Sequence, residues 1–319
     1  MADLEGEGAD VPAEPVSAAD EPTLEGGNTL EEQRDEQAGD VTKSESDTEI
    51  DFNEELIQMN NWLVREPYLP KNIDEEVLIT FLWNTETVEE AQDKLLKYFY
   101  ARQSMKAVFA ERHPCSPNNL LKYDAVCVVP LTTGLDKKWI IFATWLSHDD
   151  PTKFSIYHMM KLIFTELDIL LQENQIRGKT VSVIIDMNGY TEEHTKMITR
   201  FAAKKICELF TDCFPAKFNG FYIVNAPEHV ADYTVLFGPF DFHLVEYVDD
   251  LPGFLPKKFL PSDLAGEPDA PTRASLFEPF FKRMRRCGNW LAYEEFVRSQ
   301  EMLLRMTTTR EEFAFGTLK

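Results

Sequence analysis

The segment from Phe201 to Pro227 constrains the fold of this chain more than any other. It reads FAAKKICELFTDCFPAKFNGFYIVNAP, which is an amphipathic helix, a turn at Phe214-Pro215 and an apolar strand that ends at Asn225. Residues 221–224 are β-prone and continuous, as expected of a strand covered on both faces. Apolar residues at helical intervals after Pro227 predict a second helix. The segment therefore forms either ordinary core or the wall and lid of an apolar cavity.

Residues 1–50 form a strongly acidic tail. They hold 16 acidic side chains against Arg34 and Lys43, and no aromatic residue. Low hydrophobicity and like-charge repulsion leave little to offset chain entropy, so we expect this tail to be disordered. The whole chain carries a net charge of −23. Because phosphate binding needs a basic surface, we do not expect nucleic acid as a partner.

The sequence also indicates where in the cell the protein is located. The N-terminus lacks the basic and apolar layout of a signal peptide, and no stretch approaches about 18 uninterrupted apolar residues. The 5 cysteines are an odd number without CxxC spacing. This pattern fits reduced thiols better than a disulfide framework or a zinc site. We therefore expect a cytoplasmic protein without a metal.

The periodicity of apolar residues changes from helical to strand-like along the chain. Residues 51–112 predict a module of three helices. Short apolar runs at 125–129 and 139–143 predict a hairpin. Alternating helices and strands follow over 154–225, which implies parallel pairing through right-handed crossovers. The expected fold is α/β, with a mixed sheet covered by helices, and helical periodicity over 272–286 and 290–305 predicts a C-terminal extension at 271–319.

Motifs of known catalytic type are missing from the sequence. There is no glycine-rich nucleotide-binding loop, no HExxH and no GxSxG, so we do not expect an enzyme. The run from His148 to Pro151 places an imidazole beside two carboxylates, which would suit a metal or acid/base site, or a turn with a helix cap. Asp186 follows an apolar strand, where it could be catalytic or could anchor a turn.

Two basic groups each have two interpretations. Lys204, Lys205 and Lys217 either converge on a phosphate or simply face solvent. The densest positive patch lies beside two phenylalanines and consists of Lys282, Arg283, Arg285 and Arg286. Near an anionic bilayer these charges could contribute about 1 kcal/mol each, enough for transient docking. The alternative is a solvated helix face.

The pattern AKKIxxxxTDxFPxKxxGxxxxNxP over 203–227 resembles the core signature of a known family. This is the CRAL-TRIO, or Sec14-like, lipid-binding family, and the resemblance is closest to its α-tocopherol transfer protein and retinaldehyde-binding branch. Supporting matches are at 79–82, 95–98, 149–151, 185–189, 260–261 and 266–267. Together they span roughly residues 52 to 290, and the combination is more specific than any single match.

The resemblance implies an N-terminal helical domain at 51–112 and a lipid-binding domain at 113–270 whose sheet floors an apolar pocket under a helical lid. By position, the pocket would be lined by Met160, Ile163, Leu167, Val181, Ile185, Ile198, Ile206, Leu209, Phe210 and Phe214. The lid would contribute Val230, Tyr233, Leu236 and Phe240.

The implied function is intracellular lipid transport. We expect a monomer without a cofactor that binds one tocopherol, retinoid or other isoprenoid-like lipid and moves it between membranes during transient peripheral contact. The alternative is a non-catalytic regulatory adaptor that keeps the fold but has lost phosphoinositide-triggered exchange.

The resemblance also implies a basic cleft for a phosphoinositide. Lys217 matches this cleft and is the candidate phosphoinositide-binding residue. Asn84, Asn219, Leu244 and Val248 stand where basic residues are expected. These departures argue against phosphoinositide exchange.

Overall fold

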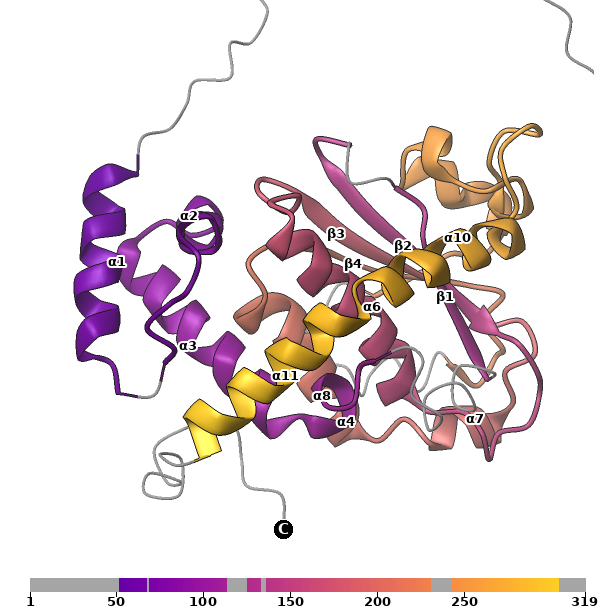
Figure 1. Ribbon diagram of the computed structural model, residues 1–319. Coiled ribbons are helices and arrows are strands. Elements are labelled where there is room, and N and C mark those ends of the chain that lie inside the picture. Colours follow the sequence, from indigo (N-terminus) through magenta and orange to yellow (C-terminus); the bar gives the residue numbers. More distant parts are fainter. Residues whose placement is uncertain (1–51, 68, 114–124, 133–135, 231–241, 304–319) are drawn as a thin grey trace, which may run out of the picture. The chain divides into compact units, whose positions relative to one another are not determined.

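A computed structural model describes residues 52–67, 69–113, 125–132, 136–230 and 242–303, all within the unit Ile50–Lys319 (Figure 1). The predicted acidic tail lies outside the described residues. The described elements form an α/β fold built on a five-stranded mixed sheet with flanking helices. The predicted fold class is confirmed.

The three predicted N-terminal helices are present as α1 (Asn53–Arg65), α2 (Glu75–Trp83) and α3 (Val88–Ser104). Asp74 caps α2 by accepting a hydrogen bond from the Glu76 N–H, and Thr87 caps α3 by accepting one from the Glu90 N–H. Such caps satisfy backbone donors that have no partner inside the helix. A further short helix, α4 (Lys106–Phe109), follows directly and was not predicted.

The sheet has the strand order β1-β2-β3-β4-β5. The strands β1 (Val126–Pro130) and β2 (Trp139–Leu146) pair antiparallel, and β3 (Thr180–Asp186) and β4 (Lys217–Val224) continue the sheet in parallel, as predicted. The edge strand β5 (Phe242–Leu244), which pairs parallel to β4, was not predicted. Proline-rich sequence beyond residue 241 gave no strand periodicity.

Helices cover both faces of this sheet. In β3, Val181 and Val183 point to one face and Ser182 and Ile184 to the other, and all four are buried. The helices that follow the hairpin are α6 (Ile156–Gln172), α7 (Glu192–Lys196) and α8 (Arg200–Glu208). The sequence predicted one helix up to about residue 213, whereas α8 ends in a π-helical turn, η1 (Leu209–Cys213).

The C-terminal part begins with three short 3-10 turns, η3 (Val248–Gly253), η4 (Lys257–Phe259) and η5 (Ser262–Leu264). The predicted helices follow as α10 (Arg273–Arg286) and α11 (Gly288–Leu303). In Figure 1 these two gold and yellow helices run one after the other, with α10 packed against β1 and α11 against α3.

Gly266 occupies a position where any side chain would collide with backbone. A Cβ atom there would lie 1.9 Å from the Leu260 carbonyl oxygen. We expect Gly266→Ala to lower the free energy of unfolding by about 1–3 kcal/mol, because backbone has to move. Urea denaturation measures this loss. Gly253→Ala is the matched control, because its Cβ would meet nothing within 4 Å; an equal loss in both variants would contradict the prediction.

Candidate functional site

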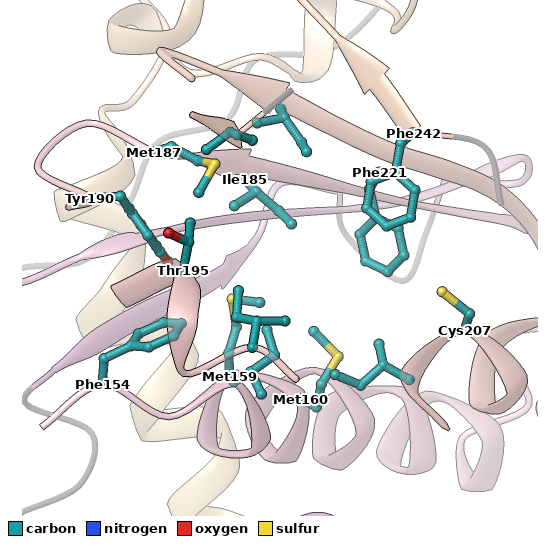
Figure 2. A pocket seen from close by; sticks show the side chains of 15 residues that line it. Phe154, Met159, Met160, Ile185, Met187, Tyr190, Thr195, Cys207, Phe221 and Phe242 are labelled. Atoms are coloured by element: carbon teal, nitrogen blue, oxygen red, sulfur yellow. The ribbon is translucent and has the colours of Figure 1, made fainter. Parts of the chain in front are cut away.

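An apolar cavity lies between the carboxyl ends of the parallel strands and the helices α6 and α8 (Figure 2). Its volume is about 50 Å³. The cavity is therefore narrow in this conformation. None of its lining residues carries a charge; they are Phe154, Ile156, Met159, Met160, Ile185, Met187, Tyr190, Thr195, Ile198, Ile206, Cys207, Phe221, Ile223, Val230 and Phe242.

The register of the sheet forms one wall of the cavity. Ile185 pairs with Ile223 across β3 and β4, and Phe221 pairs with Phe242 across β4 and β5. Residues two apart on a strand share a face, so Phe221 and Ile223 project together. The Phe221 and Phe242 rings stack with centroids 4.9 Å apart. This wall is therefore a continuous apolar surface.

Two helices form the opposite wall. From α6 come Ile156, Met159 and Met160, spaced to lie on one helical face, and Figure 2 shows the two methionines facing the strands. From α8 come Ile206 and Cys207. Burial and the nearby Glu208 raise the pKa of the Cys207 thiol to about 12, so it stays neutral at physiological pH. This wall is likewise uncharged.

The turn after β3 closes one end of the cavity. Its anchor is Asp186, whose Oδ1 accepts hydrogen bonds from the Asn188 N–H at 3.0 Å and the Asn225 side chain at 2.8 Å. The other oxygen lies 2.6 Å from Arg273. The carboxylate is thus occupied in holding the turn that carries Tyr190, which agrees with the turn interpretation of Asp186.

Five of the predicted lining residues lie on the cavity wall, namely Met160, Ile185, Ile198, Ile206 and Val230. Six others are buried in the surrounding core and do not line the cavity; they are Ile163, Leu167, Val181, Leu209, Phe210 and Phe214. Tyr233, Leu236 and Phe240 lie outside the described residues.

Distance along each element explains why some predicted residues miss the cavity. Ile163 and Leu167 lie about one and two turns beyond Met160, at about 5.4 Å per turn. Val181 precedes Ile185 by four residues, which is about 13 Å along a strand. These residues lie on the same face of the helix or strand as Met160 and Ile185, but beyond the end of the cavity.

Four phenylalanines fill the space beyond that end, and we call them the aromatic plug: Phe164, Phe210, Phe214 and Phe218. The Phe210 ring lies 4.8 Å from Phe164 and 4.5 Å from Phe218 between centroids, and Phe214 lies 5.9 Å from Phe164. Ring pairs at these separations are favourable contacts. The Phe221 ring, which lines the cavity, lies 5.5 Å from Phe210 and 4.9 Å from Phe218 between centroids, so the aromatic plug borders the cavity on this side.

Several lining residues were not predicted. Ile156 and Met159 share the face of Met160, and Phe221 and Ile223 alternate on β4, so periodicity could have identified them. Tyr190 lies in the turn after β3, and Thr195 lies on the five-residue helix α7, which is too short to show a helical period. No sequence signal marks this turn end of the cavity.

Several residues of the predicted lysine group and of the predicted phosphoinositide cleft make contacts inside the protein. Glu208 accepts from Lys205 at 2.8 Å and lies 3.7 Å from Lys204. Asn84 donates to the Pro215 carbonyl oxygen, and Asn219 donates to the Ser182 hydroxyl. Lys217 is exposed on β4. Phosphoinositide binding at Lys217 stays a prediction.

Carboxylates partly neutralise the predicted C-terminal patch. Arg283 contacts Glu166 and lies 2.5 Å from Glu173, and Arg285 lies 2.6 Å from Glu278. Arg283 is therefore directed toward the protein. Lys282 and Arg286 are exposed on α10. Membrane contact through this patch stays a prediction with fewer available charges than the sequence indicated.

The acidic run at 148–151 forms a turn. Asp150 accepts hydrogen bonds from the Thr152 N–H at 3.0 Å and from its hydroxyl at 2.7 Å. Within the described ranges, no group of three or more His, Cys, Asp or Glu side chains could hold a metal ion. Across the same described ranges, no helix has the length and apolar character needed to cross a membrane.

Known proteins resemble parts of this chain in sequence. Residues 128–240 match the family model described as CRAL/TRIO domain. The α-tocopherol transfer protein-like protein of Mus musculus is 23% identical over 202 residues, covering 59% of this chain and 58% of the relative. Its Homo sapiens counterpart is 23% identical over 220 residues, covering 64% and 63%. Clavesin-2 of Rattus norvegicus is 24% identical over 97 residues, covering 30% of each.

A solved structure, that of Sfh5, aligns with a TM-score of 0.49 and 12% identity, covering 77% of this chain and 98% of that chain. The chain spans about three fifths of the length of the first curated relatives it matches. The resemblance noted in the sequence is confirmed. This chain carries a CRAL/TRIO domain over residues 128–240 and is homologous to α-tocopherol transfer protein-like proteins and clavesins.

Proposed function

We propose that this protein binds one hydrophobic small molecule, of tocopherol, retinoid or similar isoprenoid type, and carries it between membranes. The observation that carries this proposal is the cavity between sheet and helices, whose lining residues are all uncharged. The relatives named α-tocopherol transfer protein-like support the same class of cargo. The protein would work in the cytoplasm, as a monomer, with transient membrane contact.

Solvation explains why such a carrier would be needed. Each CH₂ group moved from hydrocarbon into water costs about 0.8 kcal/mol, so a chain of about 20 carbons faces a barrier on the order of 16 kcal/mol. An apolar cavity removes most of this cost, because the cargo passes from one apolar environment to another. The carrier then needs no covalent intermediate.

The narrowness of the cavity implies a conformational step during loading. A lipid needs more room than a cavity of about 50 Å³ provides. Val230 lines the cavity and immediately precedes residues 231–241, which include the predicted lid residues Tyr233, Leu236 and Phe240. If the lid prediction holds, opening of that lid would admit a ligand to the cavity.

A vesicle transfer assay tests the proposal. Donor vesicles contain α-tocopherol, acceptor vesicles contain none, and the two populations are separated after incubation with the protein. A carrier increases the initial transfer rate in proportion to its concentration. A protein that binds vesicles without accelerating transfer would support the regulatory adaptor instead.

Exposed apolar residues beside the cavity form a candidate membrane contact. Met197 and Phe201 are 52% and 42% exposed, and they flank Ile198, which lines the cavity. Arg200 and Lys204 are exposed on the same segment. Apolar side chains with adjacent cations suit an anionic bilayer surface.

We expect the double variant Met197→Ser with Phe201→Ser to bind vesicles containing phosphatidylserine about tenfold more weakly, because two apolar side chains no longer enter the bilayer. Flotation measures the bound fraction. The control is Ile57→Ser with Val64→Ser, which removes two exposed apolar residues from α1. Equal weakening by both double variants would show that this surface has no special role.

A further inference from the structure

Exposed apolar side chains gather around the 3-10 turn η3. Tyr247 precedes this turn and Phe254 follows it, and the two residues are 63% and 46% exposed. Leu244, at the end of β5, is 45% exposed. A single exposed apolar residue is ordinary on a protein surface, but three within residues 244–254 indicate a contact surface.

The ring of Phe254 is held in place by two neighbours. Its centroid lies 5.8 Å from that of Tyr222 and 5.8 Å from that of His243. The Tyr222 and His243 rings stack with centroids 4.7 Å apart. A side chain that is already held in position loses little conformational entropy when a partner binds, so this ring is suited to a binding surface.

This aromatic cluster lies on the face of the sheet opposite the cavity. Tyr222 and His243 alternate along β4 and β5 with Phe221, Ile223 and Phe242, which line the cavity. Successive side chains of a strand point to opposite faces. The surface around η3 is therefore separate from the proposed lipid site.

Negative charge surrounds the exposed rings. Glu246, Asp249 and Asp250 are exposed on or beside η3, and within the described ranges no basic side chain forms an ion pair with them. In the sequence, no lysine or arginine occurs between Lys217 and Lys257. Their negative charge is thus available to a partner.

The next lysines along the chain are directed to other acidic residues. Lys257 lies 3.1 Å from Glu267, and Lys258 lies 3.9 Å from Asp136. These pairs leave the carboxylates around η3 uncompensated. Because opposite charges steer and select partners, such a surface favours a cationic partner.

An open groove adjoins the exposed rings. It lies among the three 3-10 turns and has a volume of about 580 Å³, which is within the range of ligand-binding sites. Val248 and Asp249 of η3 line it, together with Ser262 and Asp263 of η5. Asp263 lies 2.9 Å from Arg273, whereas Asp249 has no ion pair among the described residues. The groove therefore combines room for a side chain with one uncompensated carboxylate.

We propose that this acidic aromatic surface, formed by Glu246, Tyr247, Asp249, Asp250 and Phe254 with the adjoining groove, binds an arginine-rich, partly apolar segment of a partner protein. A guanidinium group pairs with carboxylates and also stacks on aromatic rings, so it matches both features of the surface. Apolar side chains of the segment would cover Tyr247 and Phe254.

Other occupants fit this surface less well. The chain's own tail holds 16 acidic side chains in residues 1–50 against Arg34 and Lys43, and an anionic bilayer is likewise negative, so the carboxylates repel both. In the part of the chain that the structure describes, no group of three or more His, Cys, Asp or Glu side chains could hold a metal ion.

Fluorescence anisotropy of a short labelled peptide of alternating arginine and leucine tests the proposal with the full chain. We expect wild-type protein to bind this peptide at physiological salt. Asp249→Lys with Asp250→Lys should weaken binding by about tenfold or more, because attraction becomes repulsion. The matched control is Glu54→Lys with Glu89→Lys, which changes the net charge equally at exposed positions of α1 and α3 and should bind as wild type does.

A second pair of variants tests the apolar part. Tyr247→Ser with Phe254→Ser should weaken binding of the arginine and leucine peptide by about fivefold to tenfold, because two exposed rings are removed. Ile57→Ser with Val64→Ser removes two exposed apolar residues from α1 and should leave the affinity unchanged.

Three results would overturn the proposal. The first is no binding of the peptide by wild-type protein. The second is equal weakening by both charge variants, which would show general attraction to an acidic protein. The third is loss of binding to phosphatidylcholine vesicles in Tyr247→Ser with Phe254→Ser while peptide binding is unchanged, which would assign the surface to lipid instead.

Discussion

Ile185→Trp is expected to lower lipid binding by tenfold or more while the protein stays folded. Ile185 lies on β3 in the strand wall, opposite Ile223, and Figure 2 shows it facing the cavity. An indole ring there occupies space that the lipid needs. Forcing a ligand against a filled site costs about 1–3 kcal/mol or more, which corresponds to at least tenfold in affinity. Retention of α-tocopherol after gel filtration measures the effect.

Ile79→Trp is the matched control for this substitution. Ile79 is also a partly buried isoleucine, but it lies on α2 and does not line the cavity. The control should bind lipid as wild type does. If Ile185→Trp binds and transfers lipid normally, the cavity described here is not the binding site.

The second large effect is expected at Asp168, at the centre of a buried ionic network. Asp168 is 1% exposed, and its carboxylate accepts a hydrogen bond from the Tyr98 hydroxyl at 2.7 Å. Arg102 and Arg112 both contact its other oxygen. Arg102 also lies 2.9 Å from Glu294 on α11. This network joins the N-terminal helices to α6 and to the C-terminal helix.

We expect Asp168→Asn to lower the free energy of unfolding by about 3–5 kcal/mol, because two buried guanidinium groups lose their shared counter-charge. Urea denaturation measures the loss. Asp93→Asn is the matched control, since Asp93 pairs with Lys97 on the surface of α3. Exposed pairs contribute about 0–1 kcal/mol. A loss below 1 kcal/mol in Asp168→Asn would contradict the importance of the network.

The difference in free energy of unfolding between wild type and Asp168→Asn should depend on pH. Burial raises the pKa of Asp168, but Arg102 and Arg112 outweigh this effect and hold it below its usual value. In the unfolded protein the pKa of an aspartate is about 3.9, and above this pH the lowered pKa of Asp168 stabilises the folded state. This contribution is lost as the pH falls through the pKa that Asp168 has in the folded protein. The difference between wild type and Asp168→Asn should therefore be constant at neutral pH and shrink below about pH 4.

Periodicity predicted which face of each element is apolar, and Met160, Ile185 and Ile206 on those faces line the cavity. The helical and strand periods determine on which face of an element each side chain lies, because they follow from local backbone geometry. They do not determine where a cavity ends. That boundary depends on the aromatic plug, whose members Phe164 and Phe210 are separated by 46 positions and meet only in the folded chain.

The same limit applies to charges and turns. The sequence shows four basic residues between 282 and 286, but not that Arg283 pairs with Glu166 and Glu173, more than 100 residues earlier. Likewise, Tyr190 is placed by a turn that Asp186 anchors, and no periodic pattern reports such a position. The ion pairs of Arg283 and the position of Tyr190 depend on tertiary packing. The order of helices and strands depends on local sequence patterns and could therefore be predicted.

The bound molecule itself tests the central claim most directly. Protein purified without detergent is extracted with organic solvent, and the extract is quantified by mass spectrometry against the protein concentration. We predict close to one hydrophobic lipid per chain, and a large reduction in Ile185→Trp purified in the same way. An extract without stoichiometric lipid, from wild-type protein that also takes up no α-tocopherol from vesicles, would contradict a lipid carrier.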